Sequence, residues 1–313
     1  MAPSSSTLER SAQGQFVTRL SKLPWWLLLI LLAGVFLLYK FTTDELYSFI
    51  LGKLKQGILV TIFVTTVAYA AAIVIGLIAG LGRVSKNPAI FNLATLYVQI
   101  IRGVPILVQI FYITFVVTPA LFAAVNWVGN GLAGPLGLHP MLDYLAKANP
   151  AQIDAALSGL NVFQRSVVWL AQVDAQSLSF LTRVIFALAV AYGGFEAETF
   201  RAGIESIGKG QMEAARSLGM SYVQAMQHII LPQAVRRVLP PLGNDFISML
   251  KDSSLVSVLG VRDVTQEARV YAAVSFRYPE TLNSLAFVYL SMTVALSLGV
   301  KWIESRMEHG RSG

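Results

Sequence analysis

Long apolar runs separated by short polar or basic segments are the dominant pattern of the chain. A helix needs roughly 20 predominantly apolar residues to cross a bilayer, and several of these runs approach or exceed that length. The pattern predicts an all-α integral membrane protein with about six transmembrane helices. The predicted spans are residues 24–41, 57–81, 89–117, 178–200, 232–259 and 282–303.

The first run, PWWLLLILLAGVFLLYKF, is short for a span and carries tryptophan and tyrosine at its ends. Such amphipathic rings favour the membrane interface. A signal peptide is the alternative interpretation, but the chain continues into KFTTDELY without a small-residue cleavage site. We therefore expect residues 24–41 to be a retained transmembrane helix that follows a Ser-rich cytoplasmic tail, residues 1–23.

Residues 126–177 interrupt the series of spans. The turn-rich sequence GNGLAGPLGLHP is followed by moderately amphipathic stretches with helical periodicity. This composition predicts an insertion that lies outside the membrane and forms short helices of its own.

The charged residues indicate how the spans are oriented. Only 13% of the residues are charged, against roughly 25% in an ordinary soluble domain. The net charge of +7 comes from basic residues scattered between apolar runs, which argues against a nucleic-acid partner. Six spans place both termini on one side, and a cytoplasmic assignment puts the larger share of Lys and Arg inside. The tail 304–313 and the segment 201–234 are then cytoplasmic, and the insertion 126–177 is extracytoplasmic.

Enzymatic and metal-binding chemistry is not expected. Cysteine is absent, and the three histidines lie far apart in the sequence, which argues against a metal site. GIESIGKG nearly matches the phosphate-binding pattern G-x-x-x-x-G-K-[ST], but Gly210 replaces the hydroxyl residue and an apolar helix precedes it where a strand should be. If ATP drives this protein, the ATPase that binds ATP and Mg²⁺ is another chain.

The most polar stretch between two spans is EAARSLGMSYVQAMQHIILPQA. We expect a first helix with Glu213 at its N-terminus, where the helix dipole favours an acid, and a left-handed cap at Gly219. Ser221 and Gln224 have the spacing of a capping box, so a second helix should start at once. Pro232 should end or redirect that helix. The prediction is a compact helix–turn–helix at the cytoplasmic surface, with an ordinary solvated loop as the alternative.

This stretch resembles the EAA signature of ATP-binding-cassette (ABC) importer permeases. The matching residues are Glu213, Ala214, Ala215 and Gly219, followed at the family's spacing by I-x-L-P. RGVPILVQIFY, ILPQAVRRVLPPLGNDF and KDSSLVSV resemble the polar amino acid group of these permeases, the histidine, glutamine and arginine type. The first span and the insertion lie outside the five-span family core.

The resemblance implies a type I importer permease domain of MetI-like fold over residues 56–303, in a bacterial inner membrane. Two permease chains, identical or sister chains, would face each other above two ATPase subunits. An extracytoplasmic binding protein would deliver a polar amino acid. The EAA residues would then form the coupling helix that docks in a groove of the ATPase.

Two charges and two hydroxyls interrupt the fifth apolar run at Lys251, Asp252, Ser253 and Ser254. Ionisable groups within a bilayer are costly and normally face a cavity or a partner. One interpretation is a path for a polar amino acid. The other is structural, with Lys251 paired to Asp252 or Asp245.

Charges also mark the third and fourth runs. Arg102 interrupts the third, and we favour a structural role near the interface or at helix-end carbonyls. Glu198 and Arg201 have the i,i+3 spacing of an ion pair on one helix face. Glu198 also matches an acidic position of the family, so a place in the solute path stays open for it and for Arg102.

Two other functions are compatible with the spans. A permease for another small polar solute would share the same signature. A secondary transporter would need its own coupling-ion site and inverted repeats with paired broken helices, and no convincing repeat is present.

Overall fold

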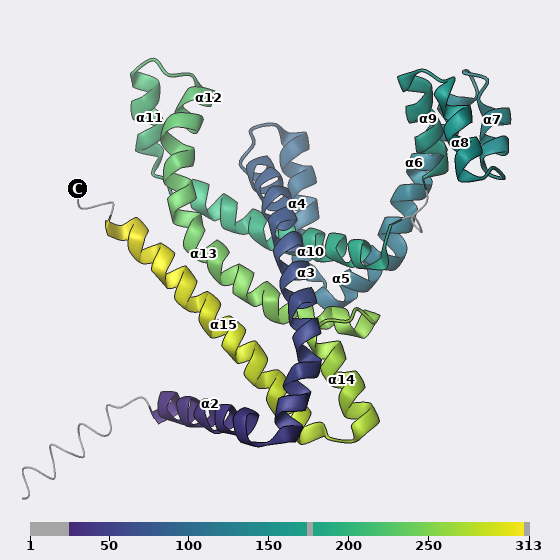
Figure 1. The fold of residues 1–313 in the computed structure, drawn as a ribbon. Coiled ribbons are helices and arrows are strands. Elements are labelled where there is room, and N and C mark those ends of the chain that lie inside the picture. Colours follow the sequence, from purple (N-terminus) through teal and green to yellow (C-terminus); the bar gives the residue numbers. More distant parts are fainter. Residues whose placement is uncertain (1–24, 174–177, 310–313) are drawn as a thin grey trace, which may run out of the picture.

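The computed structural model describes residues 25–173 and 178–309, and every regular element in these ranges is helical (Figure 1). The tail 1–23 and the end of the tail 304–313 lie outside the described residues. The α-helices are α2 (Trp25–Thr43), α3 (Glu45–Arg83), α4 (Pro88–Gly103), α5 (Ile106–Tyr112), α6 (Thr118–Ala133), α7 (His139–Leu145), α8 (Pro150–Ser158), α9 (Val162–Gln172), α10 (Phe180–Glu205), α11 (Lys209–Ser217), α12 (Tyr222–Ala225), α13 (Leu231–Asp252), α14 (Val264–Ser275) and α15 (Tyr278–His309). Two π-helical turns, η1 (Ile113–Val117) and η3 (Met226–Ile230), and one 3₁₀ helix, η4 (Ser253–Leu259), complete the series.

Four helical segments of the described chain are long and apolar enough to cross a membrane. They are Glu45–Arg83, Ile106–Ala133, Phe180–Glu205 and Tyr278–Arg306, and a shorter apolar helix covers Leu28–Thr43. The predicted fifth span falls mainly in α13, which is not among the four segments.

The centre of the fold is the contact between α3 and α10, which run alongside each other. A Cβ atom at Gly76 would lie 2.4 Å from the Cβ of Glu196, and one at Gly80 would lie 2.8 Å from the Cβ of Phe200. Small residues let helix backbones approach closely where lipid provides no hydrophobic driving force. The largest apolar cluster of the protein is built around this contact.

The predicted third span is not one continuous helix, which corrects the sequence interpretation. Helix α4 ends at Gly103 and α5 begins at Ile106. Pro105 has no N–H to donate and disfavours helical backbone at Val104, so the helix breaks there. The buried Gln109 spans the break, because its Nε2 donates to the carbonyls of Ile101 and Val104 at 2.6 and 2.5 Å.

The insertion folds as a small unit beside the end of α6 (Figure 1). The predicted turn-rich stretch GNGLAGPLGLHP is wrong in its first part, because the chain stays helical to Ala133 and GNGLA belongs to α6. Beyond it, α7 to α9 form as expected, and α8 and α9 each begin with a complete capping box. The insertion shares one apolar cluster with α6, made of Ala133, Leu138, Leu142, Leu145, Val167 and Val168.

The close α3–α10 contact predicts the effect of a single methyl group. Gly76→Ala should lower stability by about 1–3 kcal/mol, because the new Cβ forces the two helices apart. Gly52→Ala on the same helix is the matched control, since no atom lies within 4 Å of its added Cβ. Thermal unfolding in detergent should show a lower midpoint for the Gly76 variant alone. Equal midpoints for both variants would contradict this view of the contact.

Candidate coupling loop and transport path

The EAA stretch forms two short helices joined at a left-handed glycine. Gly219 has a φ of 84°, and its N–H donates to the carbonyl of Arg216 while the N–H of Met220 donates to that of Ala215. These two bonds are those of a Schellman cap, which satisfies carbonyls at a helix end. Ser221 and Gln224 then make the predicted capping box and start α12.

Two details of the predicted loop are wrong. Helix α11 begins at Lys209 with Gly208 as its N-cap, so Glu213 lies in the middle of the helix and not at its N-terminus. Pro232 does not end the second helix. It lies in the first turn of α13, and the π-turn η3 joins α12 to α13 without a break at this proline.

The loop is anchored at its base and exposed at its tip. Ile204, Ile207, Ile230 and Ala234 form a buried cluster that holds it to the ends of α10 and α13. At the tip, the side chains of Leu218 and Val223 are 84% and 68% exposed. Ala214 is exposed and Ala215 is buried. The exposed side of α11 therefore carries a small side chain at position 214.

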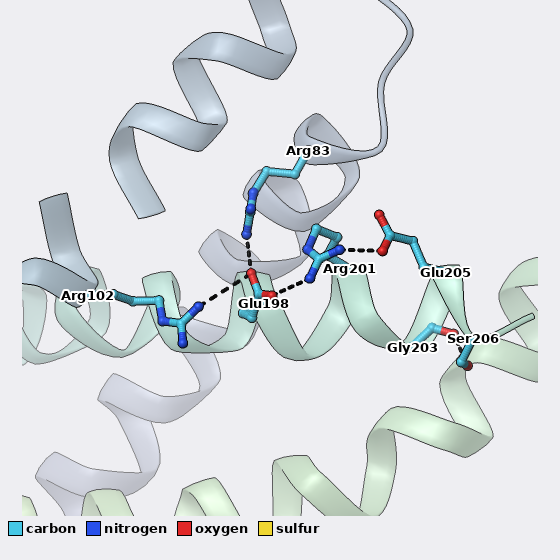
Figure 2. Close-up of polar contacts among 7 residues, drawn as sticks. All are labelled: Arg83, Arg102, Glu198, Arg201, Gly203, Glu205 and Ser206. Atoms are coloured by element: carbon cyan, nitrogen blue, oxygen red, sulfur yellow. Dashed lines mark hydrogen bonds and ion pairs between the residues drawn. The ribbon is translucent and has the colours of Figure 1, made fainter. Parts of the chain in front are cut away.

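An ion-pair network joins three helices just before the loop (Figure 2). The carboxylate of Glu198 on α10 forms ion pairs with Arg83, at the end of α3, and with Arg201 on its own helix. Arg102, at the end of α4, lies 3.7 Å from the same carboxylate. Arg201 also contacts Glu205. The i,i+3 pair is confirmed. Arg102 has a carboxylate partner and not the helix-end carbonyls that were one expectation, while its expected position near the interface stays a prediction.

The polar cluster Lys251 to Ser254 lies where α13 passes into η4. Asp252 accepts a hydrogen bond of 2.7 Å from the hydroxyl of Tyr192 on α10. Ser253 is buried and donates to the carbonyl of Leu250, while Ser254 is half-buried. The predicted pairing of Lys251 with Asp252 or Asp245 is wrong for the described chain, because Lys251 is exposed and makes no ion pair with either carboxylate.

Two further carboxylates, on α10 and α13, were not placed together by the sequence interpretation. Glu196 is fully buried, and neither of its carboxylate oxygens forms a hydrogen bond with a described residue. Asp245 accepts a bond of 3.4 Å from Thr199. The signal was present in the spacing: Tyr192, Glu196 and Thr199 share one helix face. Asp245 lies two turns before Asp252 on the facing helix.

Similarity to known proteins identifies the family. Residues 72–309 match the family described as binding-protein-dependent transport system inner membrane component. The chain belongs to this family. It is therefore a membrane transport subunit and not an enzyme. Within the described residues, no group of three or more His, Asp or Glu side chains could hold a metal ion.

The similarity to known relatives extends over nearly their whole length. The probable glutamine ABC transporter permease protein GlnM of Bacillus subtilis (strain 168) is 32% identical over 253 residues, 81% of this chain and 92% of that protein. The glutamine transport system permease protein GlnP of Escherichia coli (strain K12) is 29% identical over 255 residues, 82% of this chain and 93% of that protein.

Solved structures agree on the fold. A crystal structure of an amino acid ABC transporter with histidines aligns with a TM-score of 0.59 at 30% identity, covering 82% of this chain and 94% of that one. An inward-facing structure of the MetNI methionine ABC transporter aligns with a TM-score of 0.55 at 16% identity, covering 82% and 96%. The fold of this membrane protein is therefore that of the type I ABC importer permeases.

The Glu198 network predicts an asymmetry between two glutamates. Glu198→Gln should lower stability by about 1.5–3 kcal/mol, because it removes charge-assisted hydrogen bonds from Arg83 and Arg201 and the ion pair with Arg102. Glu205→Gln touches only Arg201 at an exposed position and should cost less than about 1 kcal/mol. Unfolding midpoints of the two purified variants test this. If the Glu205 variant were as unstable as the Glu198 variant, the loss of stability would not come from the ion pairs that join different helices.

Proposed function

We propose that this chain is the permease subunit of an ABC importer that carries a polar amino acid into the cytoplasm. Both relatives described above are named for glutamine, and the aligned structure at 30% identity is of an amino acid transporter. The observation that carries the proposal is the set of charges that α10 and α13 carry in this region. Lys251 offers a cation to a carboxylate, and Asp252 and Glu196 offer anions to an amino group, which suits a zwitterionic solute.

The path runs past Lys251, Asp252, Ser253 and Ser254. A fully buried carboxylate such as Glu196 is expensive in a membrane and is a functional-site hypothesis by default. Tyr192, bonded to Asp252, links the cluster to α10. Glu198 and Arg102 lie on the cytoplasmic side of this region, where their ion pair joins α4 to α10 beside the path.

The coupling loop meets a separate ATPase chain. Ala214 and the exposed apolar tip at Leu218 and Val223 are suited to a groove in that partner, since apolar surface of this kind is normally covered. ATP and Mg²⁺ are bound by the ATPase. The base of the loop is fixed to α10 and α13, so displacement of the tip moves both helices.

The remaining partners follow from the same architecture. A second permease chain faces this one, and an extracytoplasmic binding protein delivers the solute at the end of the molecule away from the loop. Both termini lie in the cytoplasm. The first helix and the insertion, residues 126–177, contribute to assembly or to contact with the binding protein.

Coupling should depend on the backbone conformation at Gly219. Gly219→Val should leave membrane insertion intact but abolish solute-stimulated ATP hydrolysis, because a β-branched residue is strained at a φ of 84°. Gly219→Asn is the matched control, since asparagine tolerates the left-handed region and should retain most of the activity. Co-purification of the ATPase and its stimulated rate are the measurements. Normal stimulation in the valine variant would refute the coupling role.

The path is tested by uptake of labelled amino acids into proteoliposomes that contain the whole transporter. Binding-protein-dependent uptake should be found for polar amino acids, and Lys251→Met and Asp252→Asn should each reduce it while basal ATP hydrolysis continues. If the cluster were only structural, Asp252→Asn should lower the yield of the assembled complex because it weakens the bond from Tyr192, and Lys251→Met, which breaks no ion pair with a described residue, should leave uptake unchanged. Wild-type uptake in both single variants would exclude the path.

A further inference from the structure

A cavity of about 1000 Å³ lies between the ends of α10, α13 and α15, on the same side as the coupling loop. It lies near the base of the loop, beside the first half of α13. Its lining is mixed, and the polar side chains in it include Gln233, Arg236, Arg237 and Glu304. The Lys251 cluster is ten or more residues further along α13, about 15 Å away, so the two arginines of the cavity are distant from that cluster, while Glu198 borders both the cavity and the proposed path.

Two arginines and two glutamates line the cavity. Arg236 forms no ion pair with any described residue, and neither does Arg237. A hydrogen bond of 2.5 Å from Nη1 of Arg237 to the carbonyl of Ser206 fixes that guanidinium against the end of α10. Glu198, which also borders the cavity, is already engaged by Arg83 and Arg201. Of the two glutamates, only Glu304 is left without an ion pair to a described residue. The two arginines therefore outnumber the carboxylates that remain available to them.

The surroundings of the cavity favour a lipid over a free ion. Side chains next in sequence to its lining are apolar and exposed, with Leu239 on α13 at 39% and Ile303 on α15 at 48%. In a membrane such side chains contact acyl chains or a partner helix. Basic pockets between transmembrane helices on the cytoplasmic side are suited to anionic headgroups. Arginine matches phosphate geometry with two parallel N–H donors.

We infer that this cavity binds the phosphate group of an anionic phospholipid from the cytoplasmic leaflet, with Arg236 and Arg237 as its ligands. Arg237 is held in place by Ser206, and Arg236 completes the pair from the adjacent position on α13. The lipid would lie where α10, α13 and α15 meet, immediately behind the coupling loop. Inorganic phosphate shares this chemistry, and the experiment separates the two sources.

The test measures phosphatidylglycerol retained by the assembled transporter after transfer from mixed phosphatidylglycerol and phosphatidylcholine nanodiscs into detergent. Arg236→Gln should reduce retained phosphatidylglycerol about fivefold relative to phosphatidylcholine, in line with the loss of one surface charge contact. Arg306→Gln is the control, because Arg306 is also basic and on α15 but stacks over Trp302 at 4.8 Å and does not line the cavity. That variant should retain the wild-type amount.

The outcomes are distinct from those of the solute-path experiment. Equal retention in wild type and Arg236→Gln, or an equal loss in Arg306→Gln, would overturn the proposal, since the first excludes the site and the second leaves only general surface attraction. Displacement of the lipid by added inorganic phosphate at constant ionic strength would overturn the lipid assignment in favour of the free ion. Retention that resists phosphate and depends on Arg236 supports it. Failure of amino acid uptake affects none of these results.

Discussion

The close approach of α3 and α10 is the constraint on which the rest of the structure depends. Glycines at positions such as 76 and 80 bring the two backbones together, and Glu196 is buried because the helix that carries it is pressed against α3. The same contact sets the position of Arg83, at the end of α3, beside Glu198. Helices in lipid associate through close contact of their surfaces. Here the close approach of α3 to α10 also fixes the positions of the charged side chains.

The broken and polar helices are tolerated because protein groups satisfy their backbone. At the α4–α5 break, Gln109 bonds the two carbonyls that a continuous helix would have used. Non-helical backbone at membrane depth is possible only where such partners or water are present. Helix α13 is stabilised by contacts with α3, α10 and α15 and not by its own hydrophobicity, which is why composition alone does not mark it as a span.

The sequence predicted the elements that depend on local chemistry. The left-handed cap at Gly219, the capping box at Ser221 and the helices of the insertion were all expected from neighbouring residues. It could not place groups that meet only in the fold, such as Arg83 with Glu198 or Tyr192 with Asp252. The continuous apolar run around Pro105 was also wrongly taken for a continuous helix. Hydropathy measures how apolar the side chains are and does not register the missing backbone N–H of a proline.

Helix α13 connects the coupling loop, the cavity and the polar cluster in that order. Its interior contains Pro240 and Pro241, which remove backbone hydrogen bonds and favour a bend, and Asn244 donates to the carbonyl of Pro240 at 3.2 Å. The cavity lies beside this proline pair. The part of α13 before the prolines packs against the base of the loop through Ala234, and the part after them carries Lys251. A ligand that binds one bend angle more tightly shifts the population toward that angle, so occupation of the cavity would change how displacement of the loop reaches the solute path.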